Sequence, residues 1–300
     1  MRLLDRLLAG QFDLGPVVAD HGVTVKKSLA GSQLVVVDNV AVYYSRFRGT
    51  EPAITDFPTV MLPFDITFME ARLHQVISDA YILESVGALL AMEAPTSSEE
   101  EFRSWLLSRE VKWHLHGILF VQFRGEDPKL MSDFVIPLNK EGKIIPTTDG
   151  DTRPPFAVRS VNTIRGLPIA ESADFQVGLL SLLLPILLMA LSFMHCRNVI
   201  VRKESPPAPL SRKYQKKTGR PLLQYHVIQI DHMKKVLERE GHASTEGLKK
   251  ALHICRGHFA TYGEEGKGLL FGRHAGRFWI PMHVRGKPEQ GVVLKDYDVK

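Results

Sequence analysis

The sequence predicts an α+β protein: a larger mixed α/β body followed by a small domain of helices and an antiparallel sheet. Three observations predict this fold class. Short β-branched and aromatic runs alternate with turn residues, one 18-residue run carries no charge, and a basic, Pro-containing stretch precedes the end of the chain. We therefore expect an acidic body over 1–203 that includes a buried hydrophobic helix at 177–194, a Pro-rich basic linker over 204–221, and a basic His/Arg-rich domain over 222–300.

Two hairpins are expected in the body. Gln33–Val37 and Val40–Tyr44 are rich in β-branched and aromatic residues, and the polar Asp-Asn pair between them predicts a turn. Residues 134–145 hold the second hairpin, with its turn at Asn139–Gly142.

Other segments of the body are less uniform in what they predict. Trp113–Phe123 alternates well enough for a central strand, whereas periodicity leaves Ala80–Ala91 open between a strand and a buried helix. Serine followed by glutamates predicts a helix start at Ser97. Met1–Gly10 alternates charge with leucine, which favours a short amphipathic helix or a disordered start over a secretory signal.

The uncharged run from Val177 to Met194 fits either a buried helix or a membrane span. A span needs roughly 20 apolar residues, so the run lies at the lower limit. It also lacks a Trp/Tyr belt, and the chain's mean hydropathy is −0.05. We expect a helix buried in the core, with Pro185 kinking it.

Residues 204–221 mark the expected domain boundary. Ser205–Pro209 is predicted to be stiff and extended, and the basic run from Ser211 to Arg220 shows no apolar period. This run is either a solvated linker or a flexible arm that contacts phosphates.

The final domain is expected to follow the order β-α-α-β-β-β. A strand over Leu222–Ile230 ends at Asp231, which suits the cap of a first helix. A second helix would start at Ser244 or Thr245 and run through Leu252. Three β-type pieces follow, at Cys255–Tyr262, 269–284 and 291–299.

Charge divides the chain unevenly. Residues 1–200 carry 18 Lys/Arg and 23 Asp/Glu, whereas residues 201–300 carry 20 and 10. A basic segment on an acidic body suggests a polyanionic partner, although a solvated basic face explains the same charge. Only two cysteines are present, which fits a reducing compartment, and we expect a cytoplasmic protein.

The densest group of chemically active residues lies near the C-terminus, and seven of the twelve histidines follow residue 200. Residues two apart on a strand share a face, so Arg256 pairs with His258 and His283 with Arg285. These four are the candidate catalytic residues. The candidate nucleic-acid-binding residues are Arg273, Arg277, Phe259, Trp279, Lys213, Lys216 and Lys217.

Four interpretations of this group compete. Cations interleaved with aromatic rings suit nucleic acid. The same histidines and arginines suit metal-independent phosphodiester cleavage, with His as acid or base and Arg opposite the phosphorane. Zinc on Cys255, His258, His274 and His283 matches the usual ligand spacing poorly. Structural polar contacts in a Gly-rich sheet are the remaining explanation.

His114 and His116 also share a strand face, but the sequence names no third metal ligand, and two structural histidines are favoured. The chain has no G-x-G-x-x-G, Walker A, nucleophile elbow or H-E-x-x-H pattern. We therefore expect no cofactor and no metal, and whether the protein is an enzyme is left open.

Met194–Val199 and the pattern Arg256-Gly-His258-Phe259 … Trp279-Ile-Pro281 … Val284-Arg-Gly286 … Lys295-Asp-Tyr297 resemble a loosely defined group of bacterial and phage proteins with no established activity. The resemblance covers mainly the last 120 residues and implies a prokaryotic or phage setting. The helix-helix-sheet order is also similar to that of small bacterial ribonuclease toxins, at the level of fold alone.

Together these observations predict a nucleic-acid-binding or nucleic-acid-processing protein, with RNA or DNA as partner and the site in the C-terminal domain. The alternative is a non-enzymatic phage or mobile-element protein that binds a host protein through its acidic body. A membrane partner is possible on the spanning interpretation of 177–194 and is less favoured.

Overall fold

The structure is a computed structural model that describes residues 2–10, 22–44, 53–78, 81–95, 110–147, 154–161, 173–230, 251–255, 258–263, 268–270, 274–280, 283–285 and 287–292. The chain divides into two compact units: 1–194 with 201–228, and 195–200 with 229–300. The helix predicted from Ser97, and those after Asp231 and Ser244, lie outside the described residues. Ala251 and Leu252, expected at the end of the last of these helices, belong to a strand.

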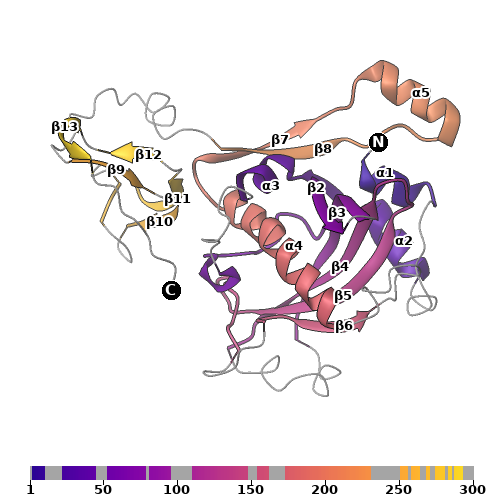
Figure 1. Cartoon of the computed structure of the whole chain (residues 1–300). Helices are drawn as coiled ribbons and strands as arrows, with labels where there is room; N and C mark the ends of the chain where they lie inside the picture. Colours follow the sequence, from indigo (N-terminus) through magenta and orange to yellow (C-terminus); the bar gives the residue numbers. More distant parts are fainter. Residues whose placement is uncertain are drawn as a thin grey trace. The chain divides into compact units, whose positions relative to one another are not determined.

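The larger unit is built on an eight-stranded mixed sheet of order β6-β5-β4-β3-β2-β1-β8-β7 (Figure 1). Its strands are β1 (Gln33–Val36), β2 (Ile66–Ser78), β3 (Tyr81–Glu93), β4 (Trp113–Phe123), β5 (Lys129–Leu138), β6 (Ala157–Val161), β7 (Val199–Glu204) and β8 (Tyr225–Ile230). From β2 to β6 each strand runs antiparallel to the next, whereas β1 pairs parallel with both β2 and β8. The α+β class is thereby confirmed, and β4 has the predicted bounds.

The segment predicted as the first hairpin is a strand followed by a helix, α3 (Asp38–Tyr44), so that prediction is wrong. The Asp38 carboxylate accepts hydrogen bonds from the Arg72 backbone N–H (2.7 Å) and the Arg2 guanidinium (2.8 Å), which hold it at the helix start. Val40, Ala41 and Tyr44 are buried together, as the helical period requires. The 3₁₀ turn η3 (Ile54–Asp56) follows.

The second predicted turn is confirmed, although it closes on an isolated bridge between Leu138 and Ile144 and no second strand forms. Asn139 Oδ1 accepts the backbone N–H groups of Glu141 and Lys143. Gly142 has a φ of +76°, a conformation that glycine adopts without strain.

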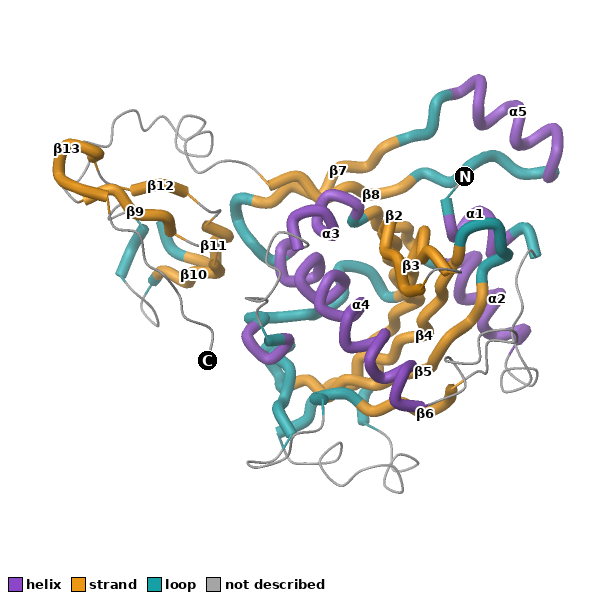
Figure 2. The backbone as a smooth tube through the Cα atoms, in the orientation of Figure 1, coloured by secondary structure: helices purple, strands orange, loops and turns teal. Residues whose placement is uncertain are grey.

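Both faces of the sheet are buried over its central part. On one face, α1 (Leu3–Leu8) and α2 (Gly22–Gly31) cover alternate residues of the central strands (Figure 2). The core cluster there comprises Leu3, Leu4, Leu7, Val25, Leu29, Leu34, Val36, Phe68, Leu89, Phe120 and Leu130. The intervening residues of β4, such as Leu115 and Leu119, are fully buried as well.

The uncharged run forms α4 (Ala173–Met194), which contacts β6, α3 and η3. From Leu183 to Phe193 every residue is buried, so the expected core helix is observed over this stretch. Ser192 donates a hydrogen bond to the Thr59 carbonyl oxygen (2.6 Å). No described helix combines the length and apolar character that crossing a bilayer requires.

The smaller unit contains two small sheets. The antiparallel pair β10 (His258–Tyr262) and β11 (Gly276–Ile280) forms one, and β12 (His283–Arg285), β9 (Ala251–Cys255) and β13 (Lys287–Val292) form the other. The segment predicted as the linker belongs to the larger unit and contains a helix, α5 (Ala208–Thr218), between β7 and β8.

Candidate nucleic-acid interface

The excess of basic charge is concentrated in the segment β7–α5–β8. Residues 201–230 contain seven Lys/Arg and one Asp/Glu, whereas residues 231–300 contain thirteen and nine. The basic segment thus belongs largely to the larger unit, while the sequence had suggested the small C-terminal domain as its location.

α5 forms because its ends are well specified. Pro207 occupies the N-cap and Pro209 lies in the first turn, where a missing N–H costs nothing. At the other end Gly219 takes the left-handed conformation (φ +82°), and its N–H donates to the Gln215 carbonyl oxygen (2.8 Å). Lys216 and Lys217 lie in the last turn, where their positive charge interacts favourably with the negative end of the helix dipole.

One side of α5 is tied to the rest of the larger unit. Ser211 Oγ accepts the Leu222 backbone N–H (3.1 Å), and the Tyr214 hydroxyl donates to the Asp5 carbonyl oxygen (3.1 Å). Thr218 donates back to the Tyr214 carbonyl oxygen (2.9 Å). These three side chains are half-buried and recur every three or four residues, so they share one side of the helix.

The opposite side of α5 is a face of exposed cations. Arg212, Lys213, Lys216 and Lys217 are all exposed, and at ~100° per residue they fall within an arc of ~140° centred opposite the anchored side. We call these four residues the α5 cationic face. Within the described parts of the chain none of them forms an ion pair. The three lysines were predicted from the sequence as nucleic-acid-binding residues. Arg212 was not among them, and the helical period identifies it.

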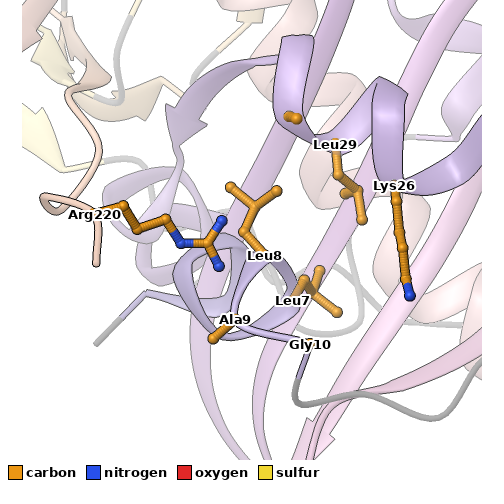
Figure 3. A pocket seen from close by; sticks show the side chains of 8 residues that line it. Leu7, Leu8, Ala9, Gly10, Lys26, Leu29 and Arg220 are labelled. Atoms are coloured by element: carbon orange, nitrogen blue, oxygen red, sulfur yellow. The ribbon is translucent and has the colours of Figure 1, made fainter. Parts of the chain in front are cut away.

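Arg220 differs from these four residues because it is half-buried. Together with Lys26 it lines a cavity of about 320 Å³ beside α1 and α2, whose walls include Leu7, Leu8 and Leu29. In Figure 3 the two cations stand on opposite sides of these leucines.

Four residues of the group predicted near the C-terminus lie on the β10–β11 pair. Phe259 is opposite Trp279, and Arg277 is opposite Thr261. His258 is exposed and Arg277 half-buried, whereas Trp279 is only 2% exposed. The Phe259 and Trp279 rings meet edge to face, 4.7 Å apart, so Trp279 packs as core and offers no open face for base stacking.

Trp279 is further held by Asn198, which is buried in the same unit. Asn198 Oδ1 accepts the Trp279 backbone N–H (2.9 Å), and Nδ2 donates to the Trp279 carbonyl oxygen (2.6 Å). Beside it, the guanidinium of Arg197 donates to the Ala275 carbonyl oxygen and lies over the Phe278 ring. Residues 195–200 thus supply polar contacts that hold β11.

The remaining candidates do not join this group in the described structure. His283 and Arg285 lie on β12, opposite Cys255 and His253 of β9, and therefore in a different sheet from His258. Arg256 and Arg273 lie outside the described residues. The described structure therefore does not show an acid, a base and a phosphate-binding cation converging on one point.

The histidine pair on β4 has a partner that the sequence could not name. His114 is fully buried, and its ring centroid is 5.9 Å from that of His116. His116 Nε2 lies 3.6 Å from Glu93 Oε2, across the β3–β4 ladder. Over the described residues, no group of three or more His, Cys, Asp or Glu is arranged to hold a metal ion.

A buried cluster of charged groups holds α1 against the sheet. It was not predicted from the sequence. Glu70 is 2% exposed; its Oε2 accepts the Leu4 backbone N–H (3.0 Å), and its Oε1 lies 3.6 Å from Arg2 Nε. Burial raises the pKa of Glu70 to about 7, although the Leu4 N–H and Arg2 act in the opposite direction. Burial likewise raises the pKa of Asp5, whose backbone carbonyl holds Tyr214 of α5.

Comparison of the chain with protein-family models, with curated proteins and with solved structures finds no match. Its function must therefore be inferred from its own residues.

Proposed function

We propose that this protein binds nucleic acid, and that the α5 cationic face is the contact surface. The supporting observation is the arrangement of α5: one side is fixed by hydrogen bonds, and the other presents four exposed cations without an acidic neighbour in the helix. Lysine and arginine bind phosphate oxygens and release the counterions condensed on the polymer, which supplies sequence-independent affinity.

Because the helix is anchored, its cations are already arranged when the ligand arrives. A flexible basic arm would lose backbone freedom on binding, at a cost of about 1–2 kcal/mol per residue that becomes ordered. The anchoring bonds of Ser211 and Tyr214 reduce that cost, because α5 is already a helix in the free protein.

The proposal is limited to binding. The described residues do not assemble a site for phosphodiester cleavage. Nucleic-acid processing and the binding of a host protein through the acidic body both stay predictions.

The test is equilibrium binding of the full chain to fluorescently labelled DNA and RNA, followed by anisotropy. The test variant replaces Arg212, Lys213, Lys216 and Lys217 with glutamine. The matched control also introduces glutamine, at four exposed lysines elsewhere in the larger unit: Lys27, Lys112, Lys140 and Lys143. Both variants lower the formal net charge from +5 to +1, so only the position of the lost charge differs.

We expect the α5 variant to lose at least tenfold in affinity and the control variant to lose less than threefold. Equal losses would show that net charge alone attracts the polymer, and no loss in the α5 variant would refute the proposed surface. The experiment needs the full chain, because a C-terminal fragment that begins at residue 205 would contain α5 and β8 without the other strands of their sheet.

A further inference from the structure

We infer that the nucleic acid bound by the α5 cationic face is a duplex, held by its phosphate backbones without regard to sequence. This inference rests on the proposed function and specifies its ligand. It depends on three features of the face: the spacing of its charges, the width of the arc they cover, and the side chains absent from it.

The spacing of the charges matches a duplex. Arg212 and Lys217 are five residues apart, so the four cations span ~7.5 Å of helix at ~1.5 Å per residue. That is one positive charge per ~2 Å. A duplex carries one negative charge per ~1.7 Å of axis when both strands are counted, or about four over this length, and each of its strands carries one per ~3.4 Å, or about two. Contact with one strand at this spacing would therefore leave about half of the cations without a phosphate, whereas contact with both strands across a groove would not.

The width of the arc points the same way. Arg212 and Lys217 lie at its two edges, ~140° apart around the helix, so their side chains diverge as they leave it. Two strands on either side of a groove present two rows of phosphates to such diverging side chains. A single strand presents one row, which only part of the arc can reach.

The face also lacks aromatic and amide side chains. Binding of single strands depends on aromatic side chains that stack on bases. Of the forked groups that read base edges, the face offers no amide and a single guanidinium, that of Arg212. Tyr214, the aromatic residue of α5, lies on the anchored side and is bonded to Asp5. Gln215 lies ~60° outside the cationic arc, at ~100° per residue.

Aromatic residues elsewhere among the described residues do not extend the face. Trp279 is core, and Phe259 packs against it. Trp113, at the start of β4, is 38% exposed and is the one large aromatic side chain among the exposed hydrophobic residues of the described chain. It therefore serves in the test as the site at which stacking by a single strand would be detected.

The experiment measures binding of the full chain to a short DNA duplex, an RNA duplex of equal length, a separated DNA strand and a duplex of unrelated sequence, from about 50 to 200 mM salt. We expect both kinds of duplex to bind at least tenfold more tightly than the single strand. The two DNA duplex sequences should differ less than threefold. For the DNA duplex, the slope of log affinity against log salt should be about −3.6, the value for four neutralised phosphates.

The four-glutamine variant should lower the magnitude of that slope towards zero. Tighter binding of the single strand, with quenching of tryptophan fluorescence that Trp113→Phe abolishes, would overturn the duplex inference and leave nucleic-acid binding intact. A preference of tenfold or more for one duplex sequence would also overturn it. If no nucleic acid binds, or if vesicles of anionic phospholipid bind through α5 and nucleic acid does not, the proposed function itself fails.

Discussion

Glu70→Gln is expected to remove a pH-dependent loss of stability from the larger unit. The Glu70 carboxyl is buried beneath α1, and burial raises its pKa from 4.5 to about 7. Between these two values the folded state holds a proton that the unfolded state has released. The free energy of unfolding of the wild-type protein therefore falls as pH rises from about 4.5 to 7 and changes little from this cause above 7.

The size of the effect follows from the shift in pKa. A rise of about 2.5 in the pKa of Glu70 corresponds to roughly 3 kcal/mol in the free energy of unfolding, at 1.36 kcal/mol per pKa unit. The charged groups around Glu70 contribute to this value: Arg2 favours the ionised form, and Asp38 and Asp5 oppose it. Glutamine cannot ionise, and its amide oxygen can still accept the Leu4 N–H, so the variant avoids this loss.

The assay is urea denaturation at pH 5 and pH 8, followed by far-UV circular dichroism, for the wild type, Glu70→Gln and the exposed-turn control Glu141→Gln. At pH 8 we expect Glu70→Gln to be more stable than the wild type by about 2–3 kcal/mol, with a much smaller difference at pH 5. The control should follow the wild type. If the wild type and Glu70→Gln lose stability in parallel between the two pH values, Glu70 is not the group responsible.

Three further substitutions or modifications test the packing. In Gly117→Ala the new methyl group would overlap the ring of Phe134, so we expect a loss of about 1–3 kcal/mol in the free energy of unfolding, whereas Gly178→Ala, with open space around it in α4, should be neutral or stabilising. Asn198→Ala removes both side-chain bonds to the β11 backbone and should cost about 2–4 kcal/mol, measured as an earlier shift in tryptophan emission during denaturation; an unchanged midpoint would contradict the role given to Asn198. Burial raises the pKa of the Cys196 thiol to about 12, so iodoacetamide at pH 8 should label it only after denaturant is added, as peptide mass spectrometry would show; rapid labelling of the native protein would disprove its burial.

The parts of the fold that sequence predicts well are those whose signal is local. Trp113–Phe123 carries an unbroken strand pattern, and β4 has those bounds. The helix at Asp38 was missed because the residues that hold Asp38, Arg2 and Arg72, lie more than 30 positions away in the chain. Runs of β-branched residues then predicted a strand where long-range contacts favour a helix.

The same distinction explains what could be predicted of the candidate site. Lys213, Lys216 and Lys217 are recognisable as a basic run, but the preceding prolines suggested an extended linker. Helical periodicity separates the anchored side, with Ser211 and Tyr214, from the cations, and that pattern was available in the sequence. The buried contacts of Glu70 depend on residues brought together only by folding, so no local pattern indicates them.

The parallel pairing of β1 with both β2 and β8 has a consequence for synthesis on the ribosome. β2 follows β1 closely, but the partner for the other edge of β1 is made roughly 190 residues later. At about 5–20 residues per second this leaves one edge of β1 without its partner for roughly 10–40 s. A nascent chain thus carries an open strand edge until residue 227 has emerged. A holdase chaperone that shields β1 during this interval would raise the yield of folded protein without contacting the finished sheet.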